Sequence, residues 1–349
     1  MSSTIRQRLN DATAGQPVER PVFAVYDWFV KNRPHVDWQS LVELGLGQIN
    51  HANVIRHEHP NFELIETTAE KDGVLRRDVR LVTDRGELHE WYAGEWRQEY
   101  FIKTPEDYTI MARALEGIQI HTDNSAFEAS EQKVGEGGIT IGQMIGIGTG
   151  RTPLMVLQID WVGLEQWSFD IAMEVPEMMA LLEQMNALKL EEVRAAAASK
   201  AEHIKLWENL SLVTMGPHLY RQHLVPLYRE IIPILNAHGK RLQVHYDGQI
   251  RGVAEDIASL GFDGIDSLTE APEGDMTVEE ARARWPDKFL WVNPNLGLYS
   301  NLATLPENIR RLQTAAGKTR SCLMISEDIP PNWQQTVPLV LDALGARRA

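Results

Sequence analysis

The feature that most constrains the fold is a series of short apolar segments that alternate with segments of helical character along most of the chain. The apolar segments lie near residues 22, 140, 204, 242, 262, 289 and 321. Strands that are apolar throughout and separated by helices are typical of a parallel sheet covered on both faces. An eighth segment, "TPLMVLQIDWVGLEQW" at 152–167, has a period that fits either a strand or a helix.

Two observations decide between the parallel α/β architectures. No G-x-G-x-x-G motif follows any of these segments, and their number approaches eight, which favours a (β/α)8 TIM barrel over a doubly wound sheet. Residues 74–102 depart from the pattern, because they alternate apolar and polar residues around Asp84-Arg85-Gly86 and so predict a β-hairpin. We expect a single domain over residues 1–349, with a β-hairpin insertion at about 70–102, since no repeat or low-complexity linker divides the chain.

The charge balance narrows the classes of partner. The formal net charge is −15, and no Lys/Arg run is present, so we expect no binding to nucleic acid or to an anionic membrane. The first residues lack the apolar core of a secretion signal, and no later apolar stretch reaches the roughly 18–20 residues of a spanning helix. We therefore expect a cytoplasmic protein. With Cys322 as its one cysteine, any metal must be held mainly by histidine and carboxylates.

Polar side chains follow most of the predicted strands, where a barrel of this kind carries its chemistry. They are Tyr26, Asp27, Trp28, Glu208, Asn209, His245, Asp247, Asp266, Asn293, Asn295, Glu327 and Asp328. His245 and Asp247 in "LQVHYDGQI" have period-two spacing, so on a regular strand both leave the same face. Together with Glu327 from the last strand they could form a three-ligand metal site with an open position, suited to zinc, manganese or iron.

Structural readings of the same three residues stay open. His245 could bond a neighbouring carbonyl group, and Asp247 before Gly248 could cap a turn or a helix. Glu327 could simply open the last helix, where the helix dipole favours negative charge.

Other strand-end residues suggest substrate binding and proton transfer. Glu208 is a candidate general acid, because burial can raise the pKa of a glutamate into the useful range, and Asn209 offers hydrogen-bond donors. Asp27 is a second candidate catalytic residue. The candidate substrate-binding residues are Tyr26, Trp28, Asn209, Tyr246 and Asn293. The cluster "HANVIRHEHP", with His51, His57 and His59, is expected at a helix end on a solvated face.

Residues 238–288, from "HGKRLQVHYDG" to "RARWPDK", resemble the uroporphyrinogen decarboxylase superfamily. This superfamily includes methyltransferases that move methyl groups between corrinoid carriers and thiols. Further matching segments are "FIKTPEDY", "WENLS", "MGPHLYRQHLVPLYREI" and "SEDIPPNW", so the resemblance spans roughly residues 20–345. It implies a (β/α)8 barrel with an active cleft at the C-terminal mouth, and relatives suggest a homodimer.

The resemblance also suggests roles for the strand-end residues. The corrinoid-linked methyltransferases look like H-x-C-G at this strand end, with a second cysteine before an acidic-Ile-Pro segment, and the three residues bind zinc. The matching positions here are His245, Asp247 and Glu327, which keep the histidine and replace both thiolates by carboxylates. The implied function is a metal-dependent methyltransferase or demethylase for a small methylated substrate, with a corrinoid protein or a thiol as partner.

Two alternative functions stay open. The first is a metal-free decarboxylase, in which Asp27 or Asp247 holds the substrate and a nearby acid protonates the carbanion. The porphyrinogen decarboxylases carry an arginine-bearing segment after the first strand, whereas "AVYDWFVKNRP" offers only Arg33. The second alternative is a barrel that has lost catalysis and binds a ligand or a partner.

Overall fold

The computed structural model describes residues 3–146, 148–325 and 333–347. The chain divides into two compact units. Unit 1 holds residues 1–54, 123–143 and 196–349, and unit 2 holds residues 55–122 and 144–195. Among the described residues, no helix is both long enough and apolar enough to cross a membrane.

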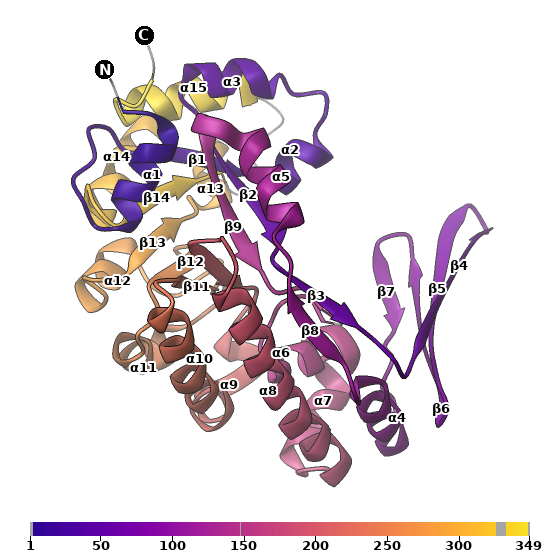
Figure 1. Ribbon diagram of the computed structural model, residues 1–349. Helices are drawn as coiled ribbons and strands as arrows, with labels where there is room; N and C mark the ends of the chain where they lie inside the picture. The colour runs from indigo at the N-terminus through magenta and orange to yellow at the C-terminus, as the bar shows by residue number, and fades with distance from the viewer. Residues whose placement is uncertain (1–2, 147, 326–332, 348–349) are drawn as a thin grey trace. The chain divides into compact units, whose positions relative to one another are not determined.

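The described part of unit 1 contains eight parallel strands that close into a barrel, which confirms the predicted α/β TIM-barrel fold (Figure 1). Around the barrel the order is β1-β14-β13-β12-β11-β10-β9-β2, and β2 pairs with β1 to close it. The strands are β1 (Phe23–Tyr26), β2 (Gly47–Asn53), β9 (Gly138–Gln143), β10 (His203–Leu206), β11 (Arg241–His245), β12 (Gly264–Leu268), β13 (Phe289–Val292) and β14 (Ser321–Met324).

Helices and short helical turns surround these strands, so that most strand residues are buried. They are α1 (Ile5–Thr13), α2 (Asp27–Asn32), α3 (Trp38–Leu44), α5 (Ser125–Val134), η1 (Gly135–Gly137), α9 (Leu212–Leu219), η3 (Tyr220–Leu224), α10 (Val225–Ala237), η4 (Arg251–Val253), α11 (Ala254–Ser259), α12 (Val278–Arg284), α13 (Leu296–Tyr299), α14 (Leu305–Ala316) and α15 (Trp333–Ala343). Local signals mark several ends; for example, Thr277 and Glu280 form a reciprocal capping box at the start of α12.

The eighth barrel strand is β2, not the segment at 152–167 that was the candidate in the sequence. That segment is helical, with α6 (Pro153–Val156), the π-helical turn η2 (Leu157–Trp161) and α7 (Leu164–Ala172). Its apolar residues lie on several sides of a buried helical stretch, which explains the ambiguous period. Strand β2 carries Gln48 and Asn50, and Asn50 donates a hydrogen bond to Ser130 of α5, so this strand does not look apolar in the sequence.

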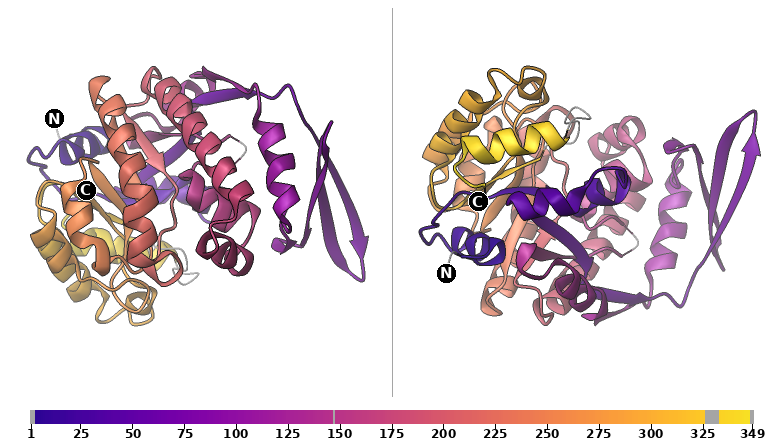
Figure 2. Two further views of the ribbon diagram at one scale, coloured as in Figure 1. Left: turned by 90° about the horizontal axis from the view of Figure 1, so that it is seen from below. Right: turned by 90° about the horizontal axis from the view of Figure 1, so that it is seen from above.

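Unit 2 contains two antiparallel sheets and several helices (Figure 2). Strands β3 (Ile55–Glu58) and β8 (Gln119–Thr122) form one sheet, and β4 (Glu63–Lys71), β5 (Val74–Thr83), β6 (Gly86–Ala93) and β7 (Trp96–Glu99) form the other. The helices are α4 (Pro105–Leu115), α6, α7 and most of α8 (Pro176–Ala197). The predicted hairpin is present as β5 and β6, although the insertion begins before residue 70 and has four strands.

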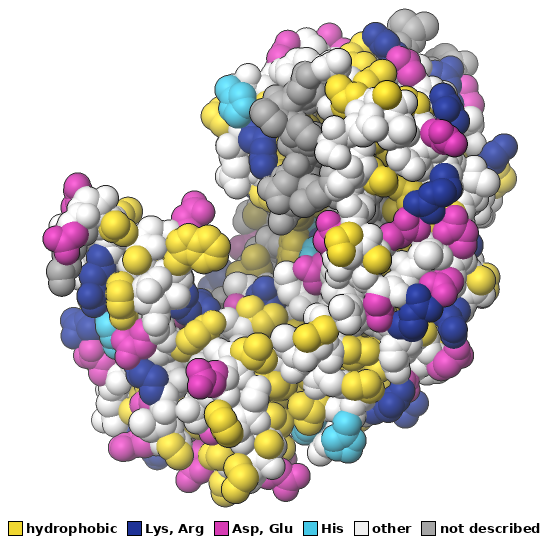
Figure 3. Space-filling model, turned by 180° about the vertical axis from the view of Figure 1, so that it is seen from behind, with side chains coloured by type: hydrophobic (Ala, Val, Ile, Leu, Met, Phe, Trp, Pro, Cys, Tyr) yellow, Lys and Arg dark blue, Asp and Glu magenta, His cyan; other side chains and the backbone are white. Residues whose placement is uncertain are grey.

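Positive and negative side chains are mixed on the face of the molecule shown in Figure 3. Dark blue Lys and Arg side chains and magenta Asp and Glu side chains are interspersed over the face drawn in Figure 3. Ion pairs between surface groups of the protein include Arg113 with Asp84 and Arg251 with Glu280.

Candidate active site at the barrel mouth

Polar side chains from four different strands meet inside the barrel at its C-terminal end. Tyr26 of β1 donates a hydrogen bond to Asp266 of β12, although these strands are not neighbours in the sheet. The contact must therefore cross the barrel interior. Lys205 of β10 and His245 of β11 reach the same carboxylate. We call Tyr26, Lys205, His245 and Asp266 the central cluster.

Asp266 is the shared partner of the central cluster. Its side chain is fully buried, and its Oδ2 atom lies 2.5 Å from Lys205 Nζ and 2.5 Å from His245 Nδ1. Burial raises the pKa of the Asp266 carboxyl, but the cationic Lys205 and the hydrogen bond from His245 outweigh it and hold this pKa far below its usual range. The carboxylate therefore stays ionised and orients both side chains.

Lys205 is a buried cation that the sequence reasoning missed. Its ammonium lies 3.6 Å from the ring centroid of Trp207, 4.9 Å from that of Tyr26 and 5.7 Å from that of Trp28. Burial lowers the pKa of Lys205, against the opposing effect of Asp266. The available signal was a lysine between Ile204 and Leu206 in "HIKLW", where strand alternation places its side chain opposite to theirs.

His51 contacts Lys205 of the central cluster from β2, the strand that the sequence analysis did not predict. It lies on β2 with its side chain 4% exposed, which corrects the prediction of a helix end on a solvated face. His51 Nδ1 lies 3.0 Å from Asp27 Oδ1, and Asp27 Oδ2 accepts a hydrogen bond of 2.5 Å from Lys31. Burial and the nearby Lys205 lower the pKa of His51 to about 4, so the ring is neutral near pH 7.

His57 and His59 belong to unit 2, and His57 is on strand β3 with its side chain 6% exposed. The two rings stack with centroids 5.7 Å apart. The prediction of a solvated histidine cluster was therefore also wrong for His57, and His51 belongs to the other unit.

The structure places two of the three predicted metal ligands together. His245 Nε2 lies 3.6 Å from Asp247 Oδ2, and Asp247 also accepts a hydrogen bond of 3.3 Å from Asn209. Burial lowers the pKa of the His245 ring, but the nearby Asp247 carboxylate and the hydrogen bond to Asp266 raise this pKa by a larger amount, so the net shift is upward. Glu327 lies outside the described residues.

These residues fit a metal ion in part. A metal-binding histidine usually donates its second ring N–H to a carboxylate, as His245 does to Asp266, and this leaves Nε2 beside the Asp247 carboxylate. Within the residues that the structure describes, no group of three His, Cys, Asp or Glu side chains could hold a metal ion. A complete site thus requires a ligand from elsewhere, and Glu327 is the residue predicted to supply it.

Glu208 takes part in a buried network that includes two tyrosine side chains. Its side chain is fully buried, and Tyr228 of α10 donates it a hydrogen bond of 2.9 Å. Tyr246 donates to Tyr228 at 2.9 Å, so this predicted substrate-binding residue is also enclosed. Burial and the neighbouring acidic and phenolic groups keep the pKa of Tyr228 and Tyr246 well above the ordinary value.

The other predicted substrate-binding residues lie at the barrel mouth. Trp28 stacks on Tyr26 with ring centroids 4.3 Å apart, and both face the ammonium of Lys205. Asn209 has a positive φ of 49° directly after Glu208, a conformation that favours Asn over most other residues. Asn293 donates a hydrogen bond of 2.8 Å to Ser267 of β12. The roles of these residues stay predictions.

A groove in unit 1 adjoins Asp27 and His51. Its volume is about 390 Å³, and α2, β2, α5 and the end of β9 contribute its lining. The polar residues that line it are Asp27, Lys31, Gln48, Asn50, His51, Asn53, Ser130, Lys133 and Gln143. Pockets of this size take small ligands, and the predicted catalytic residue Asp27 lies in its wall.

Comparisons with known proteins bear on the fold. No protein-family model and no curated protein matches the chain. A methyltransferase from Methanosarcina mazei matches with a TM-score of 0.58 and 12% sequence identity, over 99% of this chain and 99% of that chain. A structure of the pneumococcal exo-beta-D-N-acetylglucosaminidase StrH matches with a TM-score of 0.42 and 10% identity, over 94% of this chain and 83% of that chain. At such low identity, the first likeness shows that this chain shares its fold with a methyltransferase.

Proposed function

We propose that this protein is a methyltransferase or demethylase of the uroporphyrinogen decarboxylase superfamily, acting on a small methylated substrate at the barrel mouth. The observation that carries the proposal is the arrangement of His245, whose Nδ1 is bonded to Asp266 while its Nε2 faces Asp247. The fold likeness to a methyltransferase over nearly the whole of both chains supports the same class.

In this proposal His245, Asp247 and Glu327 hold a divalent metal, for which zinc is the first choice and manganese or iron are alternatives. A metal bound there would lower the pKa of a nucleophile or polarise a leaving group. Asp266 keeps His245 in the tautomer with a free Nε2, since Nδ1 carries the shared hydrogen. This is a positioning role, which Asp266 also has for Lys205 and Tyr26.

The remaining residues would bind substrate and handle protons. Asp27 and the neutral His51 form a hydrogen-bonded pair in the wall of the groove, which suits the transfer of one proton. Trp28, Asn209 and Asn293 offer a ring face and amide groups to a small molecule. Glu208 is retained as a proton donor or acceptor, reached through Tyr228. A corrinoid protein or a thiol is the proposed second substrate, and the proposed assembly is a homodimer.

A metal-free decarboxylase is the second candidate, and Lys205 is the observation that favours it. The ammonium of Lys205 already places a cation against Asp266, within 3.5 Å of His51 Nε2. A fixed cation at this position repels a divalent ion and can stabilise the negative charge that develops when a carboxylate leaves.

Metal content separates the two candidates. We expect about one zinc per chain by elemental mass spectrometry of the purified protein, and its loss from His245→Ala and Glu327→Ala, because each change removes one of three ligands. His238→Ala is the matched control, since His238 is exposed at the end of α10. Wild-type protein without metal would reject the metal-dependent mechanism and leave the decarboxylase as the better candidate.

A further inference from the structure

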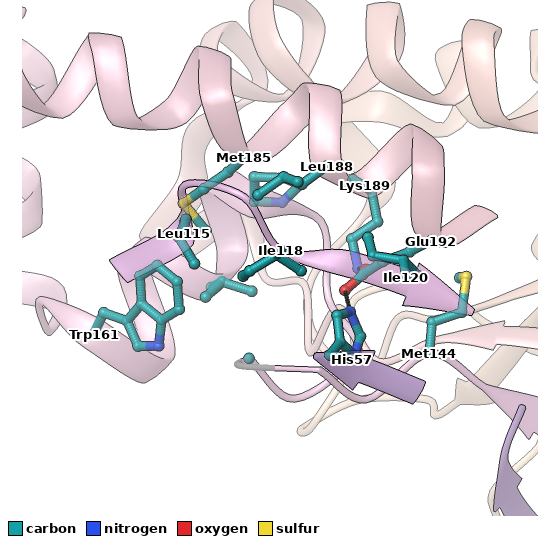
Figure 4. A pocket seen from close by; sticks show the side chains of 14 residues that line it. His57, Leu115, Ile118, Ile120, Met144, Trp161, Met185, Leu188, Lys189 and Glu192 are labelled. Atoms are coloured by element: carbon teal, nitrogen blue, oxygen red, sulfur yellow. Dashed lines mark hydrogen bonds and ion pairs between the residues drawn. The ribbon is translucent and has the colours of Figure 1, made fainter. Parts of the chain in front are cut away.

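The buried charged groups at the cavity of unit 2 pair with one another. This cavity has a volume of about 50 Å³ and lies between β3, β8 and α8 (Figure 4). Glu192 in its wall forms an ion pair with Lys189 through Oε2, and its Oε1 atom lies 2.9 Å from His57 Nε2. These contacts account for the polar part of the lining, which identifies no ligand. At the barrel mouth of unit 1, by contrast, polar contacts hold a predicted metal ligand in place.

Two loops of the barrel mouth are joined by backbone hydrogen bonds. One loop follows β10, and the other follows the neighbouring strand β11. The N–H group of Gly248 donates to Leu210 O at 3.2 Å. The N–H group of Leu212 donates to Gln249 O at 2.8 Å. Gly248 permits this close approach, because a Cβ atom there would lie 2.5 Å from Ser211 Cβ, so the two loops hold each other in place.

Asn209 connects the same two loops through its side chain. Its φ of 49° lies in the left-handed region, which Asn adopts more readily than most residues, and its Nδ2 atom donates a hydrogen bond of 3.3 Å to Asp247 Oδ2. The same Oδ2 atom lies 3.6 Å from His245 Nε2. Because 38% of the Asp247 side chain is exposed, packing alone does not fix its position. The hydrogen bond from Asn209 therefore restrains Asp247 beside His245.

The separation between Asp247 and His245 favours one coordination geometry. Two ligands that are each about 2.1 Å from a tetrahedral zinc ion lie about 3.4 Å apart. Adjacent ligands of an octahedral ion, at about the same bond length, lie only about 3.0 Å apart. The observed 3.6 Å between His245 Nε2 and Asp247 Oδ2 is closer to the tetrahedral spacing.

We propose that Asn209 is a positioning residue, which holds Asp247 at this distance from His245 and so makes the site prefer zinc to manganese. This inference rests on the metal-dependent form of the proposed function. Asn209 acts through Asp247, in the way that hydrogen-bond partners of metal ligands orient those ligands. Manganese favours octahedral sites, so Asp247 would have to leave the position in which Asn209 holds it.

The test compares the binding of zinc and manganese to the full-length protein. Competition with a chromogenic chelator measures zinc affinity, and electron paramagnetic resonance measures manganese affinity. Asn209→Gly keeps the left-handed backbone and removes the side chain, and circular dichroism verifies that the variant is folded. We expect this change to weaken zinc binding about tenfold or more, and manganese binding less than about threefold, because only zinc uses the restrained position of Asp247.

Asp72→Gly is the matched control, because Asp72 also has a positive φ, of 54°, and lies in a turn of unit 2. Crystal structures of metal-free protein give a second readout, in which we expect the Asp247 side chain to turn away from His245 in Asn209→Gly. If the wild type binds zinc, an unchanged ratio of zinc to manganese affinity in Asn209→Gly, or an Asp247 that stays in place, would overturn this inference alone. A wild type that binds neither ion would overturn the metal-dependent function together with it.

Discussion

Lys205 determines how charge is arranged in the barrel mouth. Asp266 is fully buried and shares its Oδ2 atom between Lys205 and His245, while Tyr26 donates to its other oxygen. Without Lys205, this carboxylate would keep only the His245 imidazole and the Tyr26 phenol as partners. The orientation of His245, on which the proposed function rests, therefore depends on a residue that the strand-end search did not include.

Lys205→Met is expected to destabilise the protein by about 3–5 kcal/mol, since it leaves a buried carboxylate without its cation. Urea unfolding followed by circular dichroism measures the change. Lys31→Met is the control. Lys31 forms an ion pair with Asp27, but its side chain is 64% exposed, so loss of this pair should lower the free energy of unfolding by about 1 kcal/mol or less.

The double variant Lys205→Met/Asp266→Asn should be more stable than the single variant, because it removes the uncompensated charge. If Lys205→Met alone costs no more than Lys31→Met, then Asp266 is not held ionised by Lys205.

At the scale of elements, the strands that the sequence identified are those whose apolar residues form one clear pattern. The seven strands predicted from apolar segments are all present, and so is the β5–β6 hairpin around Asp84 and Arg85. Strand β2 was missed because its outward residues are polar. Gln48 and Asn50 line the groove, and Asn50 also bonds to Ser130 of α5. Its inward residue His51 meets charged groups of the barrel interior, so neither face of β2 looks apolar.

The pairing of β2 with β9 gives a test at this scale. Gly138 pairs with Gln48, and a Cβ atom on Gly138 would lie 1.8 Å from the Gln48 backbone oxygen. Gly138→Ala should therefore separate the strands and destabilise the protein by about 2–3 kcal/mol in urea unfolding. Gly137→Ala is the control, because its Cβ would be in ordinary contact with Val42. Equal stability of the two variants would contradict this pairing.

At the scale of the whole molecule, the chain forms two compact units, and the sequence crosses between them more than once. The barrel strands β10 to β14 are buried along almost their whole length. The four-stranded sheet of unit 2 instead leaves Leu64, Leu75 and Trp96 exposed, at 56%, 56% and 78%. Regions that bury fewer apolar side chains unfold locally at a lower free-energy cost.

Hydrogen exchange followed by mass spectrometry should reveal this difference. Amides of residues 63–99 are expected to exchange at least about tenfold faster than those of β10 and β13, because local opening is easier where fewer apolar groups are buried. Peptides from α10, which packs on β11, provide the internal reference within unit 1. Equal protection of the two regions would mean that the sheet unfolds only with the barrel.

The sequence by itself determined the class of fold and the order of most strands, because alternating apolar and amphipathic segments depend on local periodicity. It also located the strand ends that carry Tyr26, Asp27, His245, Asp247 and Asp266. Only the tertiary structure decided that Lys205, His51 and Asp266 meet, since their contacts cross the barrel between strands far apart in the chain. Local periodicity contains no information about such distant contacts, and these contacts bring Tyr26, His51 and Lys205 into the polar core of the mouth.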